Sequence, residues 1–228
     1  MTRIYFEREM QRLQERVMLL GSVVENALNE SVTILLNHDM AGARQLIDAD
    51  KAINATRFSI EDDALTLIAT QQPMATDLRR LAAILEIITE LERIGDYAKG
   101  IATITQMLGD HPLVAAPANI QPMVTQARDM MLRALQCYID DNVECAHAIP
   151  REDDAVDKLF NQVQRELLNH IIADPNTIEH ANYYLWVAHN LERAADRVTN
   201  ICERLIFTVS GEMRELETSD TEEGLSGI

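Results

Sequence analysis

An internal repeat is the feature that most constrains the fold of this chain, because a pattern repeated at a constant offset predicts two similar structural units. The stretch Leu-Glu-Arg-x-x-Asp occurs with its glutamate at Glu92 and again at Glu192. Apolar, helix-breaking and acidic positions follow the same register. The matched pairs, displaced by 100 to 103 residues, are Leu35 and Tyr138, Leu46 and Ile149, Pro73 and Pro175, Asp50 and Asp153, Asn54 and Asp157, and Asp96 and Asp196.

The repeated unit is helical. Only eight glycines and six prolines occur in the chain, and its apolar residues recur at helical rather than alternating spacing. The breaker-rich segment 109–122 separates two halves, so we expect an all-α protein made of two similar three-helix bundles, 1–110 and 118–210. The acidic tail, 211–228, is short of apolar residues and is expected to be disordered. The six predicted helices lie near residues 4–37, 40–71 and 76–108, then up to 140, from 142 to 172, and up to 209.

The charge of the chain restricts its partners. Twenty Lys and Arg residues against thirty-seven Asp and Glu residues give a formal net charge of −17. This charge repels phosphate backbones, so we expect no direct nucleic-acid binding and favour cations and basic protein surfaces as partners. No run of eighteen apolar residues occurs, and the charged N-terminal stretch does not resemble a signal peptide. We therefore expect a cytoplasmic protein that meets a membrane only through other proteins.

The three cysteines give no sign of a disulfide framework. Cys137, Cys145 and Cys202 are odd in number and show no C-x-x-C spacing. This pattern also argues against a cysteine zinc site. We expect all three to be reduced thiols in the core.

The repeated acidic residues form two one-turn rows in each half. Carboxylates four residues apart on a helix repel each other, at a cost of about 0.2 to 0.5 kcal/mol per pair. A cation between two helices would reverse that cost, because oxygen ligands suit hard or borderline metal ions. The helical phases place these rows at the flank of the core, which fits either a groove between helices or a solvated face. Duplication favours the metal hypothesis, with the candidate ligands Asp50, Asn54, Glu92, Asp96, Asp153, Asp157, Glu192, Asp196 and Asn200.

The alternative functions are a metalloenzyme and a metal store. Di-iron bundles use Glu-x-x-His on facing helices, whereas here His189 precedes Glu192 and the first half has Thr89 instead. This disfavours a ferritin-like redox enzyme. No P-loop, G-x-G-x-x-G, G-x-S-x-G or H-E-x-x-H motif occurs, which removes the usual nucleotide, hydrolase and zincin hypotheses. A carboxylate-bridged redox enzyme and a metal-storage bundle are therefore kept as alternative functions.

Several segments resemble the PhoU family of phosphate-uptake regulators. They cover nearly all of the first 210 residues and respect both repeats. These segments are QQPMATDLR from Gln71, LERIGDYAKGIA from Leu91, REDDAVDKLFNQVQREL from Arg151 and NLERAADRVTNI from Asn190.

This resemblance implies metal clusters on the acidic rows, of iron or zinc, with magnesium or manganese less favoured. By matching motif, the first cluster would use Asp50, Glu92 and Asp96, and the second would use Asp153, Asp157, Glu192, Asp196 and Asn200. The first row departs from the family pattern, because Asn54 replaces a carboxylate and Gly100 stands where the second row has Asn200. We therefore expect a weaker first site.

The resemblance also implies a function without catalysis. Family members are cytoplasmic, often homodimeric negative regulators of the phosphate-starvation response and modulators of phosphate uptake. They act as adaptors between a phosphate ABC transporter, through its Pst-type ATPase, and a sensor histidine kinase of PhoR type. We expect the same role and partners for this chain, with no enzymatic activity of its own.

Overall fold

Nearly all of the described chain is helical. The computed structural model describes residues 3–109, 112–212 and 216, and no strand occurs among them. This confirms the predicted all-α class. The elements are α1 (Arg3–Asn37), α2 (Met40–Gln71), α3 (Thr76–Leu108), α4 (Ile120–Ile139), α5 (Val143–Ala148), the 3-10 turn η1 (Ile149–Glu152), α6 (Asp153–Ala173), the 3-10 turn η2 (Pro175–Thr177) and α7 (Ile178–Ser210).

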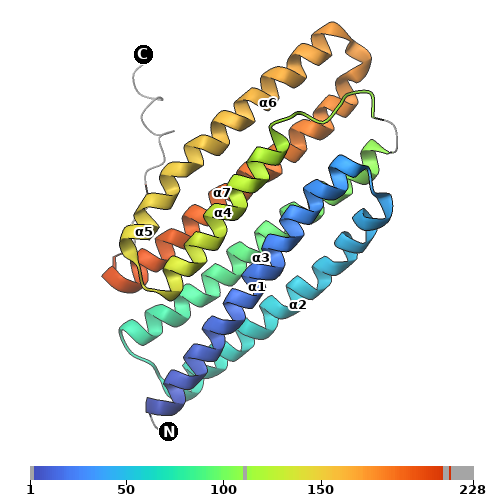
Figure 1. The fold of residues 1–228 in the computed structure, drawn as a ribbon. Coiled ribbons are helices and arrows are strands. Elements are labelled where there is room, and N and C mark those ends of the chain that lie inside the picture. Colours follow the sequence, from blue (N-terminus) through green and yellow to red (C-terminus); the bar gives the residue numbers. More distant parts are fainter. Residues whose placement is uncertain (1–2, 110–111, 213–215, 217–228) are drawn as a thin grey trace.

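The helices form two groups that lie side by side (Figure 1). Helices α1, α2 and α3 pack on one another, and α4, α6 and α7 form the second group. The groups join where α3 packs on α7 and α1 packs on α4. Helix α3 therefore has neighbours on several sides, and its buried residues include Ile87, Ile88, Leu91, Ile94 and Ala98. A helix with apolar residues on more than one face is expected in the interior, and one continuous core spans both groups.

Local signals explain the helix ends of the first group. The Asp39 carboxylate caps α2 by accepting hydrogen bonds from the N–H groups of Ala41 and Gly42, at 3.1 and 2.9 Å. The helix ends at Gln71, and the capping residue Gln72, directly before Pro73, has a left-handed φ of 49°. The polypeptide between Leu108 and Ile120 joins the two groups, and the expected division into 1–110 and 118–210 stays a prediction.

The expectation of one helix from 142 to 172 was wrong in detail. The structure divides this segment into α5, η1 and α6. Pro150 explains the division, because proline has no N–H to donate and its ring clashes with the preceding helical turn. The matching position in the first half, 103 residues earlier, is Ile47, and α2 continues through it. If α5, η1 and α6 are counted as one interrupted helix, the second group still has the three helices that the sequence predicts.

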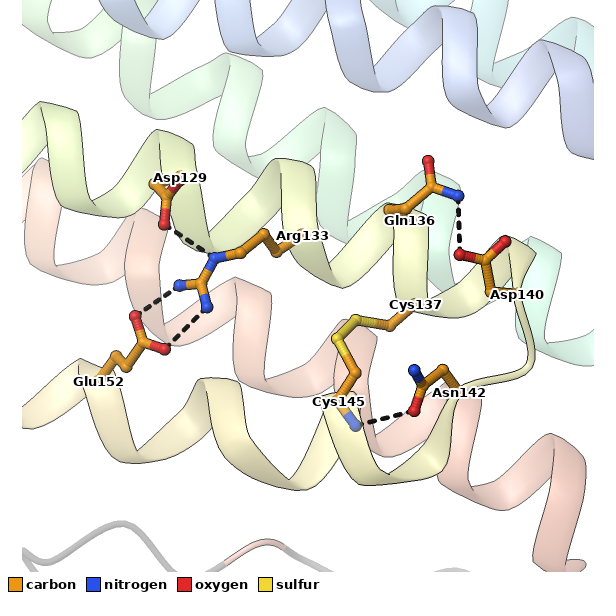
Figure 2. Close-up of a disulfide and its surroundings, with 8 residues drawn as sticks. All are labelled: Asp129, Arg133, Gln136, Cys137, Asp140, Asn142, Cys145 and Glu152. Atoms are coloured by element: carbon orange, nitrogen blue, oxygen red, sulfur yellow. Dashed lines mark hydrogen bonds and ion pairs between the residues drawn. A yellow bond between two sulfur atoms is a disulfide. The ribbon is translucent and has the colours of Figure 1, made fainter.

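The expectation of three reduced cysteines was also wrong. Cys137 on α4 and Cys145 on α5 form a disulfide, with their Cα atoms 5.9 Å apart (Figure 2). The turn between α4 and α5 brings the two helices together, and eight-residue spacing gives no sign of this in the sequence. Cys202 is a free thiol, buried in α7, and burial raises its pKa to about 12.

The C-terminal tail falls largely outside the described residues. Only 211, 212 and 216 are described beyond α7, so its expected disorder stays a prediction. The N–H of Leu216 donates to Glu203 of α7 at 2.9 Å. None of the described helices combines the length and apolar composition that crossing a membrane would require.

A buried ion pair links the two groups. Arg128 on α4 pairs with Glu25 on α1, whose exposed fraction is only 7%. The same guanidinium donates to the side-chain oxygen of Asn29 at 2.8 Å. A buried carboxylate costs free energy unless it is paired, so this contact fixes how α1 and α4 meet.

We predict that Arg128→Met lowers the free energy of unfolding by about 3 to 5 kcal/mol, because it leaves Glu25 buried without a counter-charge. The double variant with Glu25→Met should recover much of the loss. Urea titration followed by circular dichroism measures both effects. Arg12→Met is the control, because the Arg12 pair with Glu9 is exposed and worth at most about 1 kcal/mol. A loss at Arg128 no larger than at Arg12 would contradict the prediction.

We also predict that protein denatured without reductant exposes one thiol to alkylation, that of Cys202. After reduction, the other two cysteines should react as well. Closing a loop of this length stabilises the fold by roughly 2 to 3 kcal/mol, so reduction should lower the melting temperature. Mass spectrometry of the single tryptic peptide between Arg133 and Arg151 reports both bridged cysteines. Complete alkylation without reductant would exclude the disulfide.

Candidate functional site

Four carboxylates of the second half come together where α6 packs on α7. Asp153 lies in the first turn of α6, with Asp157 one turn later, and the charges of Glu192 and Asp196 of α7 act on Asp153. Asp153 is only 4% exposed, and its Oδ1 atom has no hydrogen-bond partner among the described residues. Burial, together with the charges of Asp196, Asp157 and Glu192, raises the pKa of Asp153 to about 8. This environment opposes the charged form of the carboxylate unless a cation is present.

An ion pair positions Asp153 at the start of α6. Arg133 of α4 donates two hydrogen bonds to Glu152, at 2.9 and 2.5 Å, and one to Asp129, at 2.8 Å (Figure 2). The hydrogen bonds from Arg133 lower the pKa of Glu152, so this residue stays charged. Because Glu152 directly precedes Asp153, the pair anchors the beginning of α6 against α4.

Basic groups near the second cluster are partly exposed. The Nδ1 atom of His189 lies 3.2 Å from Glu192 Oε2, and Arg193 Nη1 lies 2.7 Å from Asp196 Oδ2. Their side chains are 59% and 38% exposed. Such pairs, three residues apart on one helix, contribute little free energy and can be displaced at low cost.

Asn200 makes a contact that the sequence analysis did not anticipate. Its side-chain amide donates to Glu90 of α3 at 3.1 Å, and Arg197 lies 3.5 Å from the same carboxylate. Asn200 also lines a surface groove that includes Asp153 and Asp196. It therefore borders the second cluster while joining the two groups of helices.

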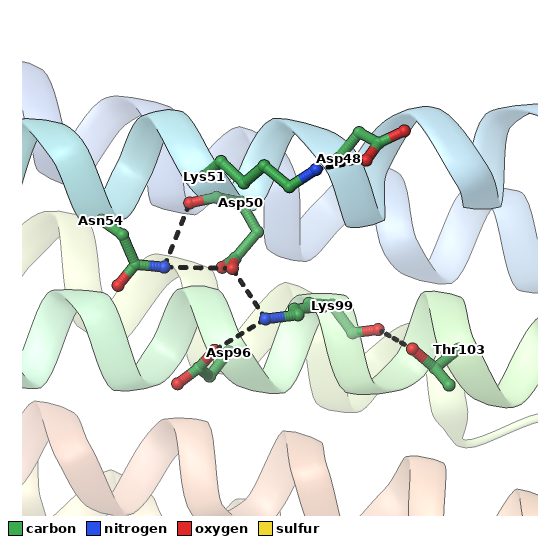
Figure 3. A network of polar contacts seen from close by, with 7 residues as sticks. All are labelled: Asp48, Asp50, Lys51, Asn54, Asp96, Lys99 and Thr103. Atoms are coloured by element: carbon green, nitrogen blue, oxygen red, sulfur yellow. Dashed lines mark hydrogen bonds and ion pairs between the residues drawn. The ribbon is translucent and has the colours of Figure 1, made fainter.

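The first half has a different arrangement, with an ammonium group between its carboxylates (Figure 3). Asp50 is 4% exposed, and its Oδ2 atom accepts from Lys99 Nζ at 2.8 Å and from Asn54 Nδ2 at 3.0 Å. Lys99 Nζ also lies 3.5 Å from Asp96 Oδ1. Burial and the charge of Asp96 raise the pKa of Glu92, while Arg57 opposes the shift.

The structure brings together the residues of each predicted row but buries two of them more deeply than expected. The sequence predicts only the angle between Asp50 or Asp153 and the apolar stripe of its own helix. It does not predict which of these side chains a neighbouring helix covers. In the described part of the chain, no three His, Cys, Asp or Glu side chains are grouped so as to hold a metal ion. A cation held by Glu192 and Asp196 would compete with His189 and Arg193 for these carboxylates.

Lys99 is the residue of the first cluster that the sequence analysis missed. The repeat contained a signal for it, because the offset of 100 residues that aligns Asp96 with Asp196 also aligns Lys99 with Thr199. That comparison reveals a cationic side chain in one half and a neutral one in the other.

Comparison with known proteins places both halves in one family. The family model described as "PhoU domain" matches residues 17–105 and again 120–205. A relative from Clostridium acetobutylicum, named as a phosphate-specific transport system accessory protein PhoU homolog, is 32% identical over 95% of this chain and 99% of its own length. The accessory protein PhoU of Escherichia coli is 31% identical over 91% of this chain and 86% of its own.

A solved structure agrees with these sequence matches. The crystal structure of the phosphate transport system regulatory protein PhoU from Streptococcus pneumoniae superposes with a TM-score of 0.86, at 28% identity. It covers 92% of this chain and 100% of the solved chain. The duplicated helical unit, its two acidic rows and these matches together show that this chain is a member of the PhoU family.

Proposed function

We propose that this chain is a non-catalytic regulator of phosphate uptake that represses the phosphate-starvation response. In this role it links a phosphate ABC transporter to a sensor histidine kinase. The observation that carries the proposal is the family match over both halves, together with relatives named as accessory or regulatory proteins of phosphate transport. None of these names describes an enzyme.

The surface charge supports protein partners over nucleic acid. A formal net charge of −17 favours basic protein surfaces and speeds association with them. In the proposed scheme the protein acts in the cytoplasm, and contact with a membrane comes only through the transporter or the kinase. We also propose that two copies of the chain form a homodimer.

We further propose that the second cluster binds a metal ion, iron or zinc. The Asp153 carboxylate supports this, because it is buried, surrounded by carboxylates and has an Oδ1 atom without a hydrogen-bond partner in the described structure. Asp153, Asp157, Glu192 and Asp196 would hold the metal, with Asn200 beside them. When bound, the metal would supply positive charge beside the buried carboxylate of Asp153. Thiol ligands are absent from this donor set, so a soft metal is disfavoured.

We predict that deletion of the gene leaves phosphate-responsive genes switched on in high phosphate, because the transporter and kinase lose their repressing link. A reporter fused to a phosphate-responsive promoter measures the effect, and plasmid-borne wild type should restore repression. Affinity capture of the full chain should recover the transporter ATPase and the kinase. Normal repression in the deletion strain would refute the regulatory proposal.

We predict that chelation lowers the melting temperature of the wild type and not that of Asp153→Asn. A metal that binds only the folded state stabilises it by about 2.7 kcal/mol at a hundredfold excess over Kd. For a domain of this size, 1 kcal/mol shifts the melting temperature by about 2 to 4 °C. Differential scanning calorimetry with and without a chelator measures the change, and elemental analysis of protein without a histidine tag identifies the metal.

The metal-free proteins provide the control. The pKa of Asp153 is raised from 3.8 to about 8 in the fold, so the folded state retains a proton that the unfolded state releases between these values. Metal-free wild type should therefore lose stability as pH rises through this window, and Asp153→Asn should lack that contribution. At pH 7 the metal-free variant should melt no lower than metal-free wild type. A clearly lower melting temperature would indicate that Asp153 stabilises the fold without a cation.

A further inference from the structure

The two acidic clusters differ in whether a basic side chain of the protein contacts the buried aspartate. In the first half, the Lys99 ammonium lies 2.8 Å from Asp50 and 3.5 Å from Asp96 (Figure 3). The Asn54 amide donates to the same oxygen of Asp50 that accepts from Lys99. The buried carboxylate of this half therefore has a positive partner supplied by the chain itself.

The matching positions of the second half contain no such partner. The repeat aligns Lys99 with Thr199 and Asn54 with Asp157. Thr199 is buried, and its hydroxyl has no hydrogen-bond partner among the described residues. Four carboxylates thus lie where the first half has three carboxylates, an amide and an ammonium group. Two cations line the groove beside Asp153: Arg193 pairs with the less buried Asp196, and Arg197 pairs with Glu90 of α3.

The burial of the paired carboxylates separates the two halves further, whereas the Lys99 and Arg193 side chains are similarly exposed, at 39% and 38%. The carboxylate that accepts from Lys99 is 4% exposed, so a metal ion would have to replace the positive partner of a buried charge to bind it. A displaced ammonium close to the metal would also repel it. In the second half, His189 and Arg193 pair with Glu192 and Asp196, which are 21% and 28% exposed, so displacing these basic groups costs less.

We infer that Lys99 takes the place of a metal ion in the first half and excludes metal from it, so that this chain binds metal in its second half alone. The inference rests on the proposed metal site of the second half and differs from the expectation that both rows bind metal. It assigns Asp50, Glu92 and Asp96 to a metal-free charge cluster. The duplicated unit would therefore contain one cluster closed by an internal cation and one open to an external cation.

Metal content of the full chain tests this assignment without any activity assay. Chelated protein would be reloaded with Zn²⁺ or Fe²⁺, dialysed and measured for metal per chain. Glu92→Gln with Asp96→Asn should leave the metal content of the wild type unchanged, whereas Glu192→Gln with Asp196→Asn should abolish it. A loss caused by the first-half variant would overturn the inference and leave the metal proposal intact.

A second variant gives the first half the residues that occupy the matching positions of the second half. Lys99→Thr with Asn54→Asp should roughly double the metal content, because it reproduces the four carboxylates of the second half and removes the ammonium group. Lys51→Thr is the matched control, because Lys51 is an exposed lysine on α2 whose ammonium group pairs with Asp48. This control should bind no more metal than the wild type. No gain in the rebuilt variant would overturn the inference.

The same measurements separate failure of the metal site in the second half from failure of metal exclusion by Lys99. If the wild type binds no metal, the metal site of the second half fails, and a gain in the rebuilt variant would still support exclusion by Lys99. Should the rebuilt variant fold poorly, Lys99→Gln removes the charge while keeping a long polar side chain. That variant should melt several degrees below wild type, and added Zn²⁺ should raise its melting temperature. A melting temperature unaffected by loss of the charge and by Zn²⁺ would count against the assignment.

Discussion

The antiparallel packing of α3 against α7 is the interaction on which the rest of the structure depends. Glu90 meets Asn200 at one position along this interface, and a Cβ at Gly100 would lie only 3.4 Å from Asn190 at another. Each of these helices carries one acidic row and also packs on α2 or α6, which carries the other row of the same half. One pair of long helices therefore joins the two groups and sets the position of both carboxylate clusters.

Burial of charge determines what those clusters can do. Asp50 and Asp153 are each 4% exposed, and a carboxylate in that environment costs free energy unless positive charge is near. The first half has Lys99 for this purpose. The second half has an aspartate whose neighbours oppose its ionisation, with a pKa of about 8. The same backbone arrangement thus gives a self-contained charge cluster in one half and a cluster that favours an added cation in the other.

Under this proposal, the two halves of the regulator would respond differently to their surroundings. The first cluster would remain unchanged as metal supply varies, because its cation is covalently part of the chain. Occupancy of the second would follow metal concentration and would strengthen the contact between α6 and α7. The Arg133 ion pair with Glu152 connects the start of α6 to α4, and α4 packs against α1. A movement of Asp153 on metal binding would therefore be transmitted to α4.

The sequence by itself determined the all-α class, the duplication and the residues of both acidic rows, because helical periodicity and a constant offset are properties of the linear chain. It also contained the Lys99 and Thr199 difference, although its meaning depended on knowing which side chains meet. Tertiary structure alone decided the burial of Asp50 and Asp153, the disulfide of Cys137 and the contact of Asn200 with Glu90. Each of these depends on which helix covers which, and helical phase within a single helix does not carry that information.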